Sequence, residues 1–378
     1  NTCYTYLGNM DEQLYCEAMT DNAYTKQPND ATQNIGNGSY STADPYVKKV
    51  WDGRYTGIRM CNELLENIDR VPDLDPELKK RYIGEAKVLR AYNYYELYTK
   101  FGDVPYTTKV LSIKESMSIA RTAKATVIAN VLADLDEVIN GNYLPTSYDA
   151  DNKGRITRWA AMAIKAKIYL FEGNWTQVKN ITSTIMTEGG FKLFGSYAGL
   201  FEIANEYNSE VILDAQYRPT SREHQMMYVF LPPTLGGYSQ LSPLQELVDS
   251  YIMLDGKTIK ETGTSFDESH PYANRDPRLK ATVMYTGNSY TLADGTEVVI
   301  NCEKGEGKDG YGVGSDCSAT GYYIKKYWDN AYRATLYSGL NPILIRYADI
   351  LLMNAEALAE LGELDKTAWD ATIKPIRD

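Results

Sequence analysis

The first half of the chain is dominated by apolar residues that recur at alternating steps of three and four, the spacing of one face of an amphipathic α-helix. In the clearest case, 45–69, seven residues share one stripe: Val47, Trp51, Tyr55, Ile58, Cys61, Leu65 and Ile68. Asp44 precedes this segment as a candidate cap, and Pro45 occupies the first helical position. The same spacing predicts four further helices, at 76–101, 124–140, 157–172 and 174–188. Because the connection between the helices at 45–69 and 76–101 is short, we expect these two helices to be antiparallel neighbours.

Two helical segments far apart in the chain are similar to each other. Residues 166–175 (AKIYLFEGNW) and 355–364 (AEALAELGEL) both have Ala at the first place and Gly at the eighth. Small residues allow close packing and Gly ends the first helix, which is the layout of a tetratricopeptide helix–turn–helix. Helical spacing also covers 343–361. The fold class predicted from these patterns is mostly α, a tetratricopeptide-like α–α superhelix.

The segment 191–340 differs from the rest because it is richer in Pro, Gly and Tyr. It holds two short strand-like pieces, EVILDAQY (210–217) and LKATVMY (279–285), and one predicted helix at 242–253. The final residues keep a helical pattern without a Gly stop, so we expect a truncated chain. Three parts of one compact unit are expected: a helical scaffold at 1–190, an irregular loop-rich insertion at 191–340, and a return to helices at 341–378.

Charge and composition narrow the classes of partner. The 378 residues include 39 Lys and Arg against 50 Asp and Glu, a net charge of −11, so no diffuse positive field exists to hold nucleic acid or anionic lipid. No run approaches the roughly 18 apolar residues that a membrane-spanning helix needs. His224 and His270 are the only histidines, which excludes His-rich zinc sites and limits any His-dependent triad to these two.

Two short motifs could suggest a cofactor or a metal. Gly305–Gly310 spells GxGxxG, but more glycines follow and no helix begins there, which favours a flexible loop over a nucleotide site. Asp149–Gly154 imitates the opening of an EF-hand loop, but Lys153 occupies a ligand place and Ala160 stands where a bidentate Glu belongs. We therefore expect no metal and no organic cofactor.

Tyrosine is unusually frequent, with 32 Tyr against 7 Phe and 5 Trp. A ring that carries a hydroxyl suits a surface that is apolar at one end and wet at the other, and its face can stack on a sugar ring. Recognition residues concentrate on loops held by a rigid scaffold. The tyrosines in or beside loops are therefore candidates for a glycan-binding surface: Tyr40, Tyr46, Tyr238, Tyr272, Tyr311 and Tyr322.

Ordered blocks of sequence over nearly the whole chain carry a family resemblance. The first two are W-x3-Y-x2-I-x3-N-x-L from Trp51 to Leu64 and IGEAKVLRAYNYYELYTKFGDVPY at 83–106. The blocks that follow are GRITRWAAMAIKAKIYLFEGNW, LSPLQELVDSYIMLDGKTI, NRDPRLKATV, TGYYIKKY and LIRYADILLMNAEALAELG. Together they resemble the SusD/RagB family of outer-membrane glycan-binding lipoproteins. The resemblance implies tetratricopeptide-like helix pairs that support an irregular ligand-binding region.

The same resemblance implies a function. It points to non-catalytic capture of an oligosaccharide or polysaccharide at the cell surface, with delivery to a SusC-like TonB-dependent transporter. It also implies an outer-membrane lipoprotein, although no signal or lipobox stands in the sequence given. A nucleic-acid partner is not expected, and contact with the membrane is expected only through that lipid anchor.

Specific residues take expected roles from the resemblance. Asp21 completes a Thr-Asp pair that the family commonly has near its glycan site, and it is expected to accept hydrogen bonds from sugar hydroxyls. Tyr238 lies where family members place an aromatic ahead of the SP-x-x-E-L-V helix. Glu85, Arg90 and Arg278 are expected to be structural: the first two form pairs within or between helices, and Arg278 anchors a loop.

Two other classes of protein remain open. An α-helical glycoside hydrolase would show the same aromatic richness and would cleave sugars with a pair of carboxylates. Because the chain has 50 Asp and Glu, no such pair can be named from the sequence. A tetratricopeptide-type interaction scaffold would instead bind peptides in a concave groove.

Overall fold

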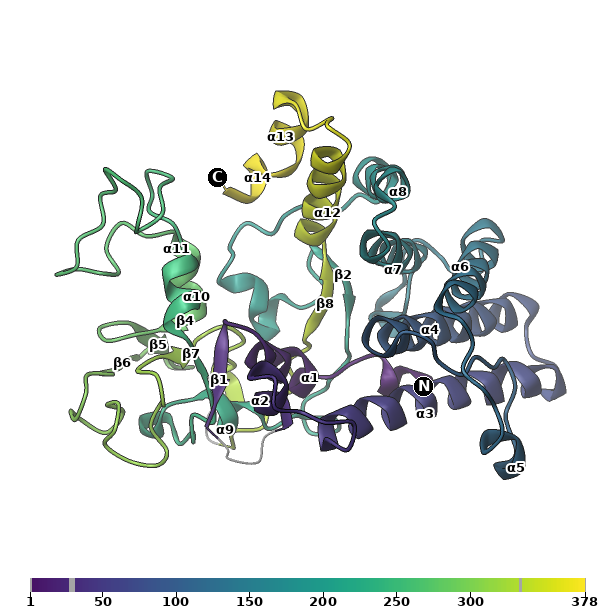
Figure 1. The fold of residues 1–378 in the computed structure, drawn as a ribbon, viewed down its shortest axis with the longest axis horizontal. Helices are drawn as coiled ribbons and strands as arrows, with labels where there is room; N and C mark the ends of the chain where they lie inside the picture. Colours follow the sequence, from purple (N-terminus) through teal and green to yellow (C-terminus); the bar gives the residue numbers. More distant parts are fainter. Residues whose placement is uncertain (1, 27–30, 333–334, 378) are drawn as a thin grey trace.

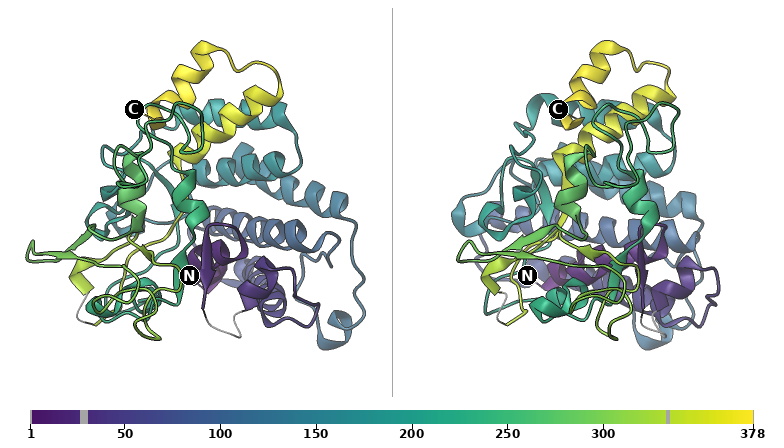
Figure 2. Two further views of the ribbon diagram at one scale, coloured as in Figure 1. Left: turned by 60° about the vertical axis from the view of Figure 1, so that its left-hand side comes forward. Right: turned by 90° about the vertical axis from the view of Figure 1, so that its left-hand side faces the viewer.

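Long helices stacked in layers form one half of the chain in its computed structural model, which describes residues 2–26, 31–332 and 335–377 (Figures 1 and 2). The longest helices are α3 (Pro45–Asn67), α4 (Pro76–Phe101), α6 (Lys124–Asn140), α7 (Arg158–Phe171), α8 (Trp175–Glu188) and α12 (Tyr347–Glu360). α3 packs on α4, α4 on α6, and α7 on α8. The mostly helical fold class and the five helices predicted before residue 190 are confirmed.

The ends of these helices follow from local sequence. The carboxylate of Asp44 accepts a hydrogen bond from the Tyr46 N–H, and Asp75 caps α4 in the same way. A proline follows each cap at the first helical position, where no intrahelical N–H is required. α4 ends at Gly102, which adopts a positive φ of 67°.

The two similar segments form matching helix–turn–helix units. Gly173, at φ 68°, separates α7 from α8, and Gly362, at φ 71°, separates α12 from α13 (Lys366–Thr372). Left-handed backbone at these two positions favours glycine because it has no Cβ. α12 packs against α8, so the C-terminal helices extend the stack begun by the first half of the chain.

The remaining elements are short. The other helices are α1 (Met10–Tyr15), α2 (Ala31–Gly36), α5 (Ile113–Ser116), α9 (Met226–Phe230), α10 (Gln245–Ser250), α11 (Pro277–Thr282) and α14 (Lys374–Arg377). The strands pair antiparallel as β1 (Ala23–Thr25) with β3 (Leu241–Pro243), β2 (Val211–Asp214) with β8 (Ile343–Arg346), β4 (Val283–Met284) with β7 (Tyr323–Ile324), and β5 (Ser289–Thr291) with β6 (Glu297–Val299).

Three predictions of secondary structure after residue 190 need correction. The helix predicted at 242–253 shrinks to α10, because 241–243 pairs with β1 as a strand and Tyr251 returns to extended backbone. The helix predicted at 343–361 begins only at Tyr347, because 343–346 pairs with β2. The strand-like piece at 279–285 is mostly α11, which starts at Pro277 behind the Asp276 cap.

Separate apolar cores underlie the helical and the loop-rich halves. The ribbon of β2 and β8 joins them: Ile212, Leu213 and Ile345 pack into the helical core, while Ile343 packs against the other. All five cysteines are free thiols, so Cys302 and Cys317 do not pair. Among the described residues, no helix is long and apolar enough to cross a membrane.

Two glycines of α3 give a stability test with opposite signs. A Cβ at Gly57 would lie 2.7 Å from the Tyr6 Cβ and 2.9 Å from the Asn93 Oδ1, whereas a Cβ at Gly53 meets nothing within 4 Å. We expect Gly57→Ala to lower the free energy of unfolding by about 1–3 kcal/mol. Gly53→Ala, its matched control, should raise it by about 0.5–1 kcal/mol, because Ala is the better helix former. Urea unfolding measures both, and equal effects would contradict the packing described here.

Candidate functional site

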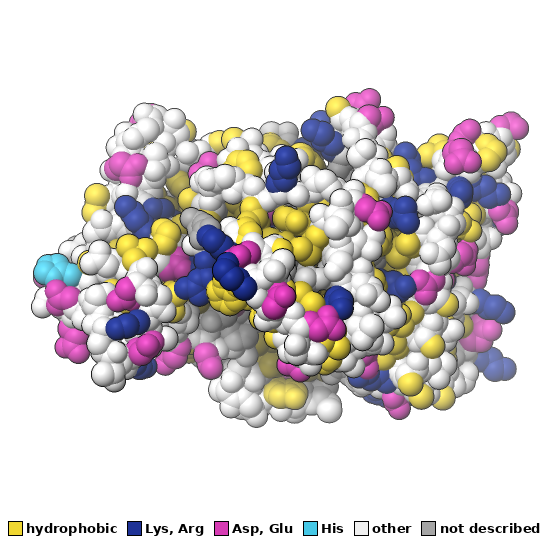
Figure 3. Space-filling model, turned by 90° about the horizontal axis from the view of Figure 1, so that it is seen from above, with side chains coloured by type: hydrophobic (Ala, Val, Ile, Leu, Met, Phe, Trp, Pro, Cys, Tyr) yellow, Lys and Arg dark blue, Asp and Glu magenta, His cyan; other side chains and the backbone are white. Residues whose placement is uncertain are grey.

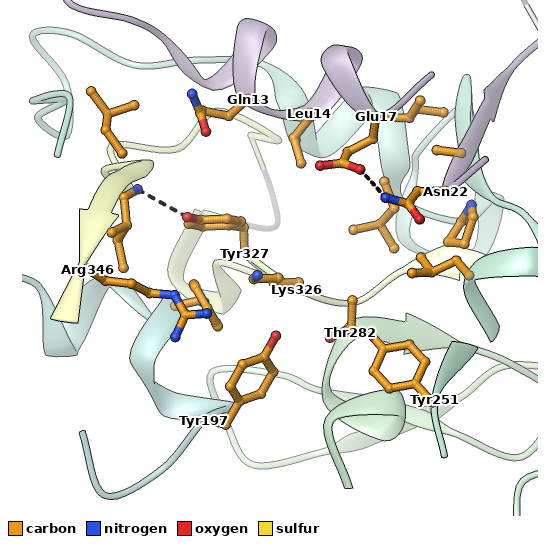
Figure 4. A pocket seen from close by; sticks show the side chains of 18 of the residues that line it. Gln13, Leu14, Glu17, Asn22, Tyr197, Tyr251, Thr282, Lys326, Tyr327 and Arg346 are labelled. Atoms are coloured by element: carbon orange, nitrogen blue, oxygen red, sulfur yellow. Dashed lines mark hydrogen bonds between the residues drawn. The ribbon is translucent and has the colours of Figure 1, made fainter. Parts of the chain in front are cut away.

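A cavity of about 440 Å³ lies between the N-terminal segment and the loop-rich half (Figure 4), and we call it the central cavity. One side is formed by α1, the turn after it and the β1–β3 pair, and the other by the chain after β7, β8 and the start of α12. Its volume falls in the range of about 300–1,000 Å³ that is common for small-molecule sites. Polar side chains that line it include Gln13, Glu17, Asn22, Tyr197, Thr282, Lys326, Arg346 and Asp349.

Lys326 lies within a group of aromatic rings on one side of the cavity. Its Nζ is 4.0 Å from the ring centroid of Phe201, 5.6 Å from that of Tyr197 and 5.9 Å from that of Tyr327. Its backbone N–H donates to the Thr282 carbonyl at 3.3 Å, which extends the pairing of β4 with β7 by two residues. The β-pair therefore fixes the point from which the ammonium group enters the cavity.

Arg346 stands beside Lys326, with its guanidinium group turned toward the cavity (Figure 4). Its Nη1 donates to the Glu210 Oε1 at 2.8 Å. Glu210 is 3% exposed and also accepts a bond from the Phe194 N–H at 2.7 Å. The backbone N–H of Arg346 donates to the Asp349 Oδ2 at 2.8 Å, which places that carboxylate at the first turn of α12.

The facing wall carries amide and carboxylate groups. Gln13 and Glu17 come from α1 and the turn after it, and Asn22 immediately precedes β1 (Figure 4). The Asn22 Nδ2 donates to the Glu17 Oε2 at 2.7 Å. The cavity therefore has cationic and hydroxyl donors on one side and mixed donors and acceptors on the other, an arrangement suited to a polar ligand with many hydroxyl groups.

Tyr197 and Thr282 place two hydroxyl groups next to the cations. Burial by itself raises the pKa of Tyr197, but the charge of Lys326, a hydrogen bond with the Thr282 hydroxyl and the charge of Arg346 outweigh it, so the pKa lies below its ordinary value. The buried Thr282 hydroxyl lies next to the hydroxyl groups of Tyr197 and Tyr251.

Three of the residues selected from the sequence lie in one neighbourhood. Asp21 is exposed and directly precedes Asn22. The Asn22 carbonyl accepts a hydrogen bond from the N–H of Leu244, the residue before Gln245. Gln245 accepts a hydrogen bond from the Tyr322 hydroxyl at 2.7 Å, and that hydroxyl is 3.4 Å from the one of Tyr272. Tyr322 is only 9% exposed, so its hydroxyl serves mainly to connect these segments.

The other selected tyrosines are spread over separate loops. Tyr238 is 45% exposed and stacks on Tyr228, with ring centroids 5.6 Å apart and an angle of 17° between planes. Tyr40 and Tyr311 are exposed, and Tyr46 is half-buried in the first turn of α3, where burial raises its pKa to about 12. Among the described residues, no ring contact or hydrogen bond joins Tyr238, Tyr40, Tyr311 and Tyr46 to one another.

The residues expected to be structural lie among helices and beside a second cavity. Glu85 is buried, which raises the pKa of its carboxyl, and its Oε2 accepts from the Arg155 Nη1 at 3.0 Å. Arg90 is 4% exposed and its Nη2 donates to the Asp134 Oδ2 at 2.6 Å, joining α4 to α6. Arg278 pairs with the carboxylate two residues before it and lines a cavity of about 320 Å³.

Sequence reasoning did not select Lys326, Tyr197 or Arg346. Lys326 and Arg346 each stand in a block that carries the family resemblance, TGYYIKKY and LIRYAD, but no spacing rule links the two. Among the described residues, no group of three or more His, Cys, Asp or Glu side chains could hold a metal ion.

Two family models match the chain, one in each half. The model described as the SusD family matches residues 200–378, and the model described as starch-binding associating with outer membrane matches residues 4–170. A SusD-like protein of Formosa agariphila is 32% identical over 211 residues, which is 53% of this chain and 40% of that protein. The chain spans 40% to 64% of the length of the curated relatives that it matches.

Solved structures resemble the whole chain. A SusD-like carbohydrate-binding protein of Bacteroides fragilis has a TM-score of 0.88 at 25% identity, and the match covers 100% of this chain and 77% of that one. Surface glycan-binding protein A of Bacteroides thetaiotaomicron, solved in complex with laminarihexaose, has a TM-score of 0.73 at 17% identity, covering 100% and 81%. At that identity the second likeness supports the fold alone.

Proposed function

The chain belongs to the SusD/RagB family, and on that basis we propose that it binds an oligosaccharide or polysaccharide at the outer membrane without cleaving it. The observation that carries the proposal is the match of the entire fold to a SusD-like carbohydrate-binding protein. The description of the second family model supports association with the outer membrane. Delivery of the glycan to a SusC-like TonB-dependent transporter, and anchoring as a surface lipoprotein, belong to the same proposal.

The chemistry of the surface supports a sugar ligand. Tyr238 presents part of its ring to solvent on top of Tyr228, and a ring held in this way can stack on the C–H face of a pyranose. Three residues further on, β3 supplies Leu241 and Pro243 to the wall of the central cavity. Asp21 precedes Asn22 and β1, which line the cavity, and β1 pairs with β3, so Asp21 and Tyr238 belong to segments that reach the cavity wall.

Affinity electrophoresis across a panel of polysaccharides tests the proposal, with the same samples assayed for newly released reducing ends. Retardation by one class of glycan without release is the expected result. Release of reducing ends would identify the hydrolase alternative, because it requires a catalytic pair of carboxylates. Absence of retardation by any glycan, together with peptide binding, would identify the interaction scaffold instead.

Removal of one exposed ring gives a specific prediction. Tyr238→Ala should weaken glycan binding by about 0.5–1.5 kcal/mol, the usual range for one aromatic contact, while the melting temperature stays nearly unchanged because the ring is 45% exposed. Tyr238→Phe, the matched control, keeps the stacking ring and should retain most of the affinity. Titration calorimetry measures both variants, and equal affinity of Tyr238→Ala and the wild-type protein would remove Tyr238 from the site.

A further inference from the structure

Four hydrogen-bond donors surround one corner of the central cavity. They are the ammonium group of Lys326, the guanidinium group of Arg346 and the hydroxyl groups of Tyr197 and Thr282 (Figure 4). The buried Thr282 hydroxyl lies within hydrogen-bond reach of the Tyr197 hydroxyl. We call this group the donor corner.

The charges of the donor corner are incompletely neutralised by the protein. Lys326 has no carboxylate within 4.0 Å in the part of the chain that the structure describes, and its ammonium group lies over the Phe201 ring and beside the Tyr197 hydroxyl. Arg346 uses one nitrogen, Nη1, for Glu210. Two other carboxylates line the cavity, but Asp349 accepts from the backbone at the start of α12, and Glu17 lies on the facing wall, bonded to Asn22.

We propose that the donor corner binds an anionic group on a sugar, so that the glycan contains acidic residues. This inference rests on the proposed function and names the class of its ligand. A carboxylate or a sulfate ester would give Lys326 the anionic partner that it lacks among the described residues and would accept from Arg346 N–H groups that do not bond to Glu210. Hydrogen bonds between charged groups are roughly twice as strong as neutral ones. The hydroxyl groups of the same sugar would meet the amide and carboxylate groups of Gln13, Glu17 and Asn22 across the cavity.

The local environment favours this ligand in spite of the acidic protein. The charges of Lys326 and Arg346, together with a hydrogen bond from Thr282, lower the pKa of Tyr197 even though burial alone would raise it. On the face seen from above, basic and acidic side chains are mixed, and that face is not uniformly basic (Figure 3). With a net charge of −11, attraction for an acidic glycan therefore depends on the cavity and not on the whole molecule.

Titration calorimetry with four oligosaccharide probes tests the inference. The probes are oligogalacturonides, which carry carboxylates, their neutral methyl esters, sulfated galactan oligosaccharides, and the neutral laminarihexaose. We expect one anionic probe to bind about ten- to a hundredfold tighter than the neutral probes. The pair of oligogalacturonide and methyl ester reports on a carboxylate, and the sulfated probe reports on a sulfate ester.

Adjacent lysines provide a matched pair of variants. Lys326→Met should lose the preference for the anionic probe by about ten- to a hundredfold. Lys325→Met is the control, since its Nζ donates to the Asn288 Oδ1 at 3.0 Å and the residue does not line the cavity. Tyr197→Phe removes a single hydroxyl group and should reduce the same preference severalfold, which keeps the test open if Lys326→Met does not fold.

The outcomes separate this inference from the proposed function. Binding of a neutral probe as tight as that of both anionic probes, unchanged in Lys326→Met and Tyr197→Phe, would overturn the acidic ligand and leave glycan binding in place. Failure of every probe, and of the polysaccharide panel above, would overturn both. A preference for an anionic probe that Lys325→Met also abolishes would place the anion outside the donor corner and overturn the inference.

Discussion

Replacing Arg90 by methionine is expected to lower the free energy of unfolding by about 3 kcal/mol. This is the lower end of the usual cost of removing one partner of a buried ion pair, because Lys87 still lies 3.5 Å from the Asp134 carboxylate. Arg90 is 4% exposed. Its Nε and Nη2 donate to the Asp134 Oδ2 at 3.1 and 2.6 Å, and its Nη1 donates to the Asn62 Oδ1 at 2.9 Å. Asn62 in turn donates to the carbonyls of Thr107 and Lys109. The substitution would therefore loosen the join between α3, α4, α6 and the loop at 107–109.

An exposed arginine on a neighbouring helix provides the control. Arg59 lies on the solvent side of α3, and Arg59→Met should change the free energy of unfolding by no more than about 0.5 kcal/mol. Urea unfolding gives both values, and glycan affinity at a temperature where both variants are folded should equal that of the wild-type protein. A stable Arg90→Met variant, or one that folds but no longer binds glycan, would contradict a purely structural role.

The helical half could be predicted from sequence because its signals are local. Caps such as Asp44 and Asp75, a proline at the first helical position, and apolar stripes several turns long all lie within one helix. The helix predicted for residues 343–346 was wrong because the cause of their structure is not local. These four residues form a strand only because 211–214, more than 100 residues earlier in the chain, pairs with them.

The site shows the same division between local and distant causes. Tyr238 and Asp21 were selected from loop position and family resemblance; neither lines the central cavity, although Asn22, next to Asp21, and Leu241, three residues after Tyr238, do. The donor corner combines Tyr197, Thr282, Lys326 and Arg346, which come from four separate segments. Each is unremarkable within its own segment. The pairing of β4 with β7 places Thr282 and Lys326, and the pairing of β2 with β8 places Arg346. Spacing along the chain carries no signal for such a cluster.

Two carboxyl groups near β2 should contribute less stability as the pH rises from about 5 to 8, because they are protonated more readily in the fold than in the unfolded chain. Burial, with a smaller effect from the charge of Asp214, raises the pKa of Glu206 from 4.5 to about 7. Burial raises the pKa of Asp214 from 3.8 to about 6. Asn341 bonds to both, through its N–H to the Glu206 Oε1 at 2.7 Å and through its Nδ2 to the Asp214 Oδ2 at 3.1 Å.

The sign follows from the direction of these shifts. Folding raises both pKa values. Between the pKa of each group in the unfolded chain and its pKa in the fold, the folded state therefore binds more protons than the unfolded state. The stabilisation is complete below pH 3.8 to 4.5 and is lost as the pH rises through about 6 and 7. Together the two groups are expected to contribute on the order of 3 kcal/mol across this range.

Glu206→Gln isolates the effect, because its amide oxygen can still accept the Asn341 N–H bond while the group no longer titrates. At pH 8 this variant should be more stable than the wild-type protein by about 1–2 kcal/mol, and at pH 5 the two should be nearly equal. Glu202→Gln, an exposed neighbour, is the control and should follow the wild-type protein at both pH values. His224 acts in the opposite direction, because burial lowers its pKa to about 4 and destabilises the fold as the pH falls. The comparison of variants cancels that contribution, so a constant difference between Glu206→Gln and wild-type protein from pH 5 to 8 would refute the raised pKa of Glu206.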